Sequence, residues 1–207
     1  MLITICRLYD SYADANRVVL ALQAVGVPPS ETSVISNNSD SWYKVNRTAS
    51  LVPLLKGDAG GEGSGKGEGA ILGATIGATA ATAASLVTML AIPGVGAVVG
   101  AGWLAAVLGS MAIGGVTGGL LGALTNAGIH EEDAQVFVEG VRRGGTLVAA
   151  RVPQAELPRI EAMMNQSAVN LEERRDLYRK SGWQSFDPNA VPYTADQVRS
   201  ERALHTR

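Results

Sequence analysis

The sequence predicts an α+β fold: a ferredoxin-like double βαβ domain with a Gly/Ala-rich hydrophobic helical hairpin inserted into it. Two observations predict this class. Patterns typical of a strand, a helix and a strand occur in that order near both ends of the 207-residue chain. Between them, residues 69–129 contain no Asp, Glu, Lys or Arg. In such a fold the second and third strands are sheet neighbours, so the ends of the insertion should emerge close together.

The first βαβ half covers residues 1–36. An apolar run from Leu2 to Leu8 is typical of a short buried strand. Asp10 or Ser11 can cap the helix that follows, which ends at Gly26. Its apolar residues recur at helical spacing and are Ala15, Val18, Val19, Leu22 and Val25. A second strand is expected around Val34 and Ile35.

Residues 37–68 are rich in Asn, Ser, Gly and charges of both signs, which predicts a flexible linker. Within it, the stretch from Gly60 to Gly67 is close to the phosphate-binding loop motif. The motif requires Ser or Thr after its lysine, but Gly67 follows Lys66 here, and no clear strand precedes the loop. A solvated hinge is therefore the better interpretation than a nucleotide site.

Small residues recur at every fourth position in both halves of segment 69–129, which predicts close helix–helix packing. The positions that define this glycine zipper are Gly69, Gly73, Gly77, Ala81, Gly114, Gly118 and Gly122. Pro93, Gly94 and Gly96 lie between the two halves and predict the bend of the hairpin. The charge-free length could cross a ~30 Å hydrocarbon layer twice.

The first arm of the hairpin is expected to be marginal as an isolated helix. It contains few large apolar residues, and each Gly costs about 1 kcal/mol of helix propensity relative to Ala. Other copies of the chain or lipid should therefore cover the segment. Three arrangements remain open: insertion into or association with a bilayer, burial between copies in a soluble assembly, or a helical pair buried within the chain itself.

The second half covers residues 130–171. Acidic residues from Glu131 start a helix that ends at Gly144, and their charge suits the helix dipole. A strand is expected at 146–152, followed by a helix at 153–164 and a short fourth strand at 168–171. The second helix should direct Leu157, Ile160 and Met164 inward.

The C-terminal tail, residues 172–207, is charged and then rich in proline and aromatic residues. Trp183, Phe186 and Tyr193 are spaced along this segment and should be covered, either by the same chain or by a neighbouring subunit. Thr194 and Gln197 have the spacing of a capping box, which predicts a last helix.

Composition and the few candidate catalytic groups argue against most chemical functions. A net charge of −2 is unfavourable for a dedicated nucleic-acid binder. Cys6 is the only cysteine and is expected to be a buried, reduced thiol in a cytosol-facing domain, with no secretory signal before it. His130 and His205 have no Cys or acidic partner at metal-ligand spacing. We therefore predict no enzyme activity and no catalytic, cofactor-binding or metal site.

Several segments together resemble bacterial general-stress, heat-induced (YflT-like) proteins that carry a glycine-zipper insertion. The matching segments are the first strand–helix–strand up to Ser36, residues 61–66, Ala91 to Gly96, Glu131 to Val148, Gly182–Trp183 and Phe186 to Pro188. The resemblance implies a stress-associated protein of unassigned biochemical activity, with no catalytic residues to transfer. Where relatives tend to have His-Gly before the last strand, this chain has Gln166-Ser167, so that position receives no role.

These observations predict a homo-oligomer in which a cytoplasmic domain presents the hairpin to a lipid bilayer. The chain itself and lipid are the expected partners, and no nucleic acid is expected. One alternative is a soluble cytoplasmic particle or ring that buries its hairpins. Another is a ferredoxin-like domain that senses a small molecule, whose identity the sequence leaves unknown.

Overall fold

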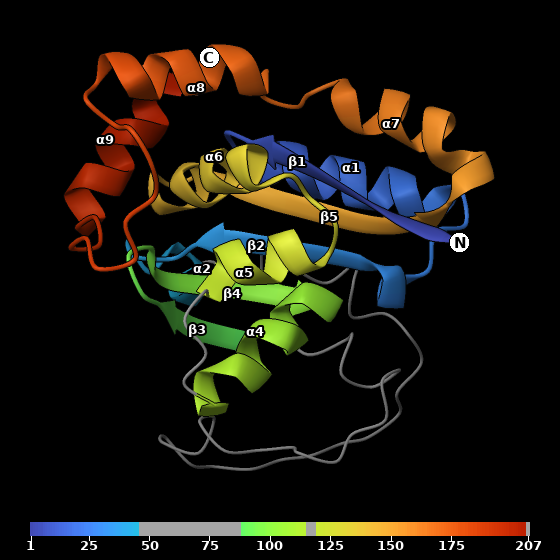
Figure 1. Ribbon diagram of the computed structural model, residues 1–207, viewed down its shortest axis with the longest axis horizontal. Helices are drawn as coiled ribbons and strands as arrows, with labels where there is room; N and C mark the ends of the chain where they lie inside the picture. Colours follow the sequence, from blue (N-terminus) through green and yellow to red (C-terminus); the bar gives the residue numbers. More distant parts are fainter. Residues whose placement is uncertain (46–87, 115–118, 206–207) are drawn as a thin grey trace.

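The computed structural model describes residues 1–45, 88–114 and 119–205 and shows an α+β protein (Figure 1). The strands are β1 (Leu2–Tyr9), β2 (Thr32–Asn37), β3 (Thr88–Ile92), β4 (Gly96–Gly102) and β5 (Thr146–Pro153). The helices are α1 (Tyr12–Ala24), α2 (Trp42–Val45), α4 (Trp103–Gly114), α5 (Gly119–Asn126), α6 (Glu131–Arg142), α7 (Leu157–Asn165), α8 (Leu171–Lys180) and α9 (Ala195–His205). Short 3-10 turns occur at η1 (Pro29–Glu31) and η3 (Gln154–Glu156).

The five strands form one antiparallel sheet in the order β1-β5-β2-β4-β3. The second and third predicted strands, β2 and β5, are neighbours as expected, with Val34 opposite Val148. Because β5 lies between β1 and β2 and runs antiparallel to both, the first two strands are parallel to each other. Such a parallel connection needs a crossover, and α1 provides it.

Helix α1 forms where its sequence signals agree. The Ser11 hydroxyl accepts a hydrogen bond from the Asp14 backbone N–H at 3.0 Å, which caps the first turn. Gly26 follows the helix with a φ of 93°, a left-handed conformation that favours glycine. The predicted inward residues Ala15, Val18 and Leu22 are buried, and Val25 is partly buried against the same core.

Residues 88–90 and 97–102, which border the expected bend and were expected to be helical, form strands instead, and that part of the prediction is wrong. This stretch is a β-hairpin, β3 and β4, whose inner strand pairs with β2. Glycine makes this pairing possible: a Cβ on Gly100 would lie 2.7 Å from Ile35 Cδ1, and one on Gly102 would lie 2.1 Å from the Thr32 carbonyl oxygen. The small residues therefore allow a close approach between strands, and residues 88–102 belong to the same sheet as β1.

The expected strand at 168–171 is also absent. The Val169 backbone N–H donates to the Leu8 carbonyl at 2.8 Å, so the segment touches the edge of β1 once. The Asn170 side chain then accepts hydrogen bonds from the Glu172 and Glu173 backbone N–H groups and caps α8. Helix capping at Asn170 thus ends the extended segment before a ladder can form.

Two hydrophobic cores lie on the two faces of the sheet. Helices α1 and α7 cover one face, where Val19, Ile160 and Met164 are buried. Helices α4, α5 and α6 cover the other face, where Leu104, Leu124 and the strand residues Leu8, Ile35 and Leu147 are buried. Within the described ranges, no helix is long and apolar enough to cross a membrane.

Candidate functional site

Most of the predicted zipper positions lie outside the described residues: Gly69, Gly73, Gly77, Ala81 and Gly118. Gly114 is the last residue of α4, and Gly122 lies within α5. A Cβ added to Gly122 would meet nothing within 4 Å. No close helix approach occurs at Gly122 in the described structure, and the zipper as a packing motif stays a prediction.

The predicted bend residues Pro93, Gly94 and Gly96 do reverse the chain, but they join two strands rather than two helices. Gly94 and Gly96 have positive φ values of 72° and 105°. A Cβ on Gly94 would lie 2.6 Å from the Asp187 carbonyl oxygen and 2.8 Å from Phe186 Cζ. The turn therefore packs against the C-terminal tail.

The three tail aromatics that were expected to clasp the same chain or a neighbour contact their own chain. Phe186 packs against the core beneath α4, α5 and α6, and Trp183 meets the Tyr178 ring edge-on, with ring centroids 5.9 Å apart. The Tyr193 ring lies 4.6 Å from the Arg142 guanidinium carbon, a cation–π contact.

A buried ionic cluster, Glu139 with Arg142 and Arg143, holds the tail to α6. Glu139 is fully buried, and Arg143 Nε donates to its carboxylate at 2.6 Å. Burial is the largest single effect and lowers the pKa of Arg143, but the hydrogen bond and charge of Glu139 together with Tyr193 and Glu201 outweigh it, and the pKa is raised. The Arg143 guanidinium also stacks on Tyr178, and burial raises the pKa of Tyr178 to about 12. The sequence suggested only helix-dipole charges here, because the partners come from α8 and α9.

Ion pairs also fasten α8 and α9 to the domain. Arg174 of α8 pairs with Asp10 at 2.8 Å, and Arg202 of α9 pairs with Asp40 at 2.6 Å. Arg202 also donates to the carbonyl oxygens of Gly144 and Asn37 at 2.8 Å. The tail is thus part of the folded domain.

A polar cavity of about 140 Å³ lies where β1 and β2 end and β5 begins. The hydroxyl groups of Ser36 and Thr146 lie 2.9 Å apart in its wall, and Arg202 and the Tyr12 and Trp42 rings complete it. Trp42 Nε1 donates to the Asn37 carbonyl at 2.6 Å. Asp10 also lines the cavity, which therefore combines hydroxyl groups and two aromatic side chains with one acidic and one basic group.

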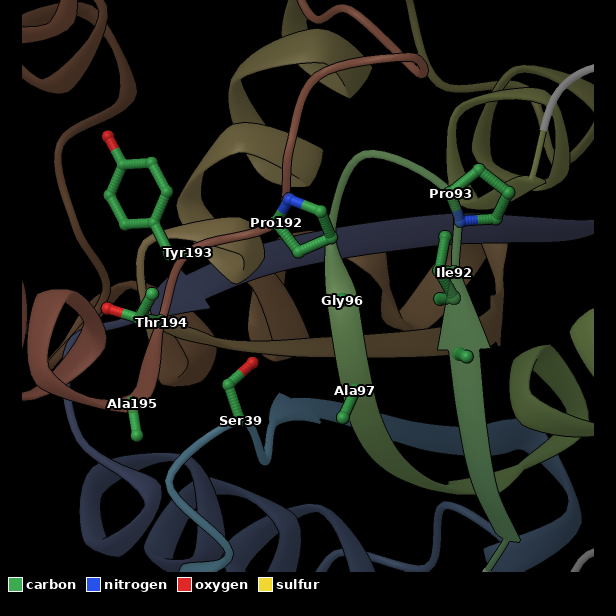
Figure 2. A pocket seen from close by; sticks show the side chains of 10 residues that line it. Ser39, Ile92, Pro93, Gly96, Ala97, Pro192, Tyr193, Thr194 and Ala195 are labelled. Carbon is green, nitrogen blue, oxygen red and sulfur yellow. The ribbon is translucent and has the colours of Figure 1, made fainter.

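An open apolar groove of about 560 Å³ lies between the β3–β4 hairpin and the segment before α9 (Figure 2). Ala91 and Ala97 line it from the strands, and Pro192 lines it from the tail. Figure 2 shows Pro192 beside Gly96, and a Cβ on Gly96 would lie 3.0 Å from Pro192 Cβ. Small side chains on the hairpin leave this space open.

Strand β3 is an edge strand without charge. In the described part of the sheet it pairs with β4 alone. Its sequence is Thr-Met-Leu-Ala-Ile, Met89 is 41% exposed, and Ala91 is exposed. Natural edge strands usually carry charge, proline or a cover that prevents pairing with another chain. The opposite edge, β1, does carry such protection, namely Arg7 and the hydrogen bond from Val169.

Charged residues are segregated in the described structure. Elements β3, β4, α4 and α5 contain none, whereas β1, α1, β5 and α6 to α9 each contain at least one. In Figure 1, β3 and α4 lie on the side of the molecule away from α8. We call β3, β4, α4 and α5 together the charge-free side.

Groups suited to metal binding do not gather in the described residues. His130 is exposed before α6 and makes no side-chain capping bond. His205 ends α9, where burial and then Arg174 lower its pKa. Among residues 1–45, 88–114 and 119–205, no group of three or more His, Cys, Asp or Glu side chains could hold a metal ion. Burial raises the pKa of the Cys6 thiol to about 12, which makes it a poor nucleophile.

Comparison with protein families, curated proteins and solved structures finds no match to this chain.

Proposed function

We propose that this protein is a non-enzymatic, self-assembling protein whose charge-free side is covered by other copies of the chain. One observation carries the proposal: the described elements of segment 69–129 are all uncharged and lie together on one side of the molecule. An uncharged side with an exposed Met89 next to an unprotected strand edge is a typical association surface.

Self-assembly also agrees with the way the rest of the chain is built. Tyr193 and Tyr178 stack on the arginines at the end of α6, and the arginines of α8 and α9 pair with Asp10 and Asp40, all within one chain. They are therefore occupied by intramolecular contacts, and the charge-free side is the better place for contacts between copies. The small residues from Gly69 to Ala81 and at Gly114, Gly118 and Gly122 would add close helix contacts to the assembly.

The finer fold description, a ferredoxin-like double βαβ domain with an inserted hydrophobic segment, is part of this proposal. The neighbouring β2 and β5 and the crossover through α1 support it. A role under stress rests on the resemblance to general-stress proteins alone. Lipid is the alternative cover for the charge-free side.

The experiment measures the native mass of the purified full-length protein in buffer without detergent, and then its flotation with vesicles of neutral lipid. Oligomers in buffer that do not float are the expected result. A monomer that floats with vesicles would replace self-assembly by membrane association. A monomer that stays in solution would refute the proposal in both forms.

A further inference from the structure

We propose that β3 pairs with β3 of a second copy in antiparallel orientation about a two-fold axis at Leu90, which joins two five-stranded sheets into one. This inference rests on the proposed self-assembly and names the contact through which two copies join.

The hydrogen bonds of β4 show which backbone groups of β3 are directed outward. The Asn38 backbone N–H donates to the Ala97 carbonyl at 2.8 Å, so Ala97 directs its backbone groups toward β2. Backbone groups alternate along a strand, so Gly96, Val98 and Gly100 direct theirs toward β3. Their partners are Ile92, Leu90 and Thr88. The N–H and C=O groups of Met89 and Ala91 therefore point away from the sheet.

These outward groups fit a two-fold pair. With Leu90 at the axis, Met89 lies opposite the partner's Ala91, and Ala91 lies opposite the partner's Met89. Each of these two pairs can exchange both backbone hydrogen bonds, while the two Leu90 residues form the non-hydrogen-bonded pair between them. A strand without charge meets its own copy without like-charge repulsion, which a charged edge would suffer.

The side chains also match. Met89 is large and 41% exposed, whereas Ala91 is small and lines the apolar groove of about 560 Å³. Directly opposed residues in an antiparallel pair share one face with their Cβ atoms about 5 Å apart. The partner's Met89 would therefore lie over Ala91 and reach the groove beside Pro192. Methionine is flexible enough to fill such an irregular space.

Proline at an outward position tests the hydrogen bonds. Met89→Pro removes an outward N–H without removing a β3–β4 hydrogen bond, and Met89→Lys puts a charge at the same place. Both variants should weaken self-association at least tenfold by sedimentation, whereas Met89→Leu and Leu20→Lys on the exposed surface of α1 should not. Melting curves check that each variant is folded. If Met89→Pro does not fold, the test depends on Met89→Lys alone.

Cysteine at the axis tests the register. The two Leu90 Cα atoms would be about 4.5 Å apart in a non-hydrogen-bonded pair, which is within disulfide range. Leu90→Cys should form a disulfide-linked dimer under mild oxidation. Ala91→Cys is the matched control. In this register each Ala91 lies opposite the partner's Met89, so two cysteines at position 91 would be too far apart to form a disulfide. Cys6 is buried and identical in both variants.

Two results would overturn the pairing: oligomers of Met89→Lys as stable as those of the wild type, or no more cross-linking in Leu90→Cys than in Ala91→Cys. If the wild type still assembles in that case, self-assembly stands and another surface mediates it. If the wild type is monomeric at every concentration, both the pairing and the proposed assembly are wrong.

Discussion

Gly102 and Gly122 show that glycines in the same uncharged segment have opposite structural roles. Gly102 ends β4 with a φ of 90°, and a Cβ there would lie 2.1 Å from the Thr32 carbonyl oxygen. Gly122 lies in α5 with open space around it. In the sequence both are simply small residues in an uncharged segment. Their different roles become visible only from the backbone conformation and the neighbouring atoms.

Gly102→Ala should therefore destabilise the fold, because the new methyl group meets backbone that cannot move independently and φ is unfavourable. We expect a loss of about 3 kcal/mol in the free energy of unfolding, measured by chemical denaturation. Gly122→Ala is the control and should raise stability by about 0.5–1 kcal/mol in a helix interior. Equal effects of the two substitutions would contradict the assignment of Gly102 to a close strand contact.

Tyr178 should make stability depend on pH in alkaline solution. Its pKa is raised by burial to about 12, against about 10 in an unfolded chain. The folded state keeps the proton longer, so the contribution is complete below pH 10 and is lost as pH rises toward 12. Between these values the wild type should lose roughly 2–3 kcal/mol more than Tyr178→Phe. If the free energy of unfolding of the two proteins fell equally between pH 10 and pH 12, the pKa of Tyr178 would not be raised and the prediction would be wrong.

At the scale of elements, sequence patterns predicted best where several local signals agreed. Three signals define α1, namely the cap at Ser11, the helical spacing from Ala15 to Leu22, and Gly26. The predicted capping box of the last helix also forms, between Thr194 and Gln197. The hairpin β3–β4 was missed because a short apolar run does not distinguish strand from helix by periodicity. Its conformation depends on partners far away in sequence, as in the hydrogen bond from Ser33 Oγ to the Ala101 carbonyl at 2.6 Å.

The candidate site was predictable only in outline. The absence of charge across residues 69–129 marked the region in which the proposed association surface lies. Its edge strand could not be foreseen, because that depends on the sheet order. The sequence also left open whether Trp183, Phe186 and Tyr193 contact their own chain, since their partners Tyr178 and Arg142 lie in helices packed together only after folding.

Helix α9 should detach when its main anchor is removed. Arg202→Ala deletes three hydrogen bonds and leaves Asp40, whose side chain is 9% exposed, without its ion-pair partner. We expect a loss of about 3 kcal/mol and faster amide hydrogen exchange across α9. Arg199→Ala on the same helix removes only an exposed pair with Asp196 and should cost less than about 0.5 kcal/mol. Unchanged exchange in Arg202→Ala would show that other contacts hold α9.

At the scale of the whole molecule, two kinds of surface coexist. Helices α8 and α9 are fixed by charges that pair within the chain, while the charge-free side ends at β3, an edge strand that pairs only with β4 in the described residues. The β1 edge is protected and the β3 edge is not, so β3 is the edge of the sheet at which a second copy can pair.

Sedimentation velocity of the full-length protein, without detergent and over a hundredfold range of concentration, tests this account most directly. The account predicts a sedimentation coefficient that rises with concentration from that of a monomer to that of a dimer or larger assembly. A single monomer species across the whole range would contradict it.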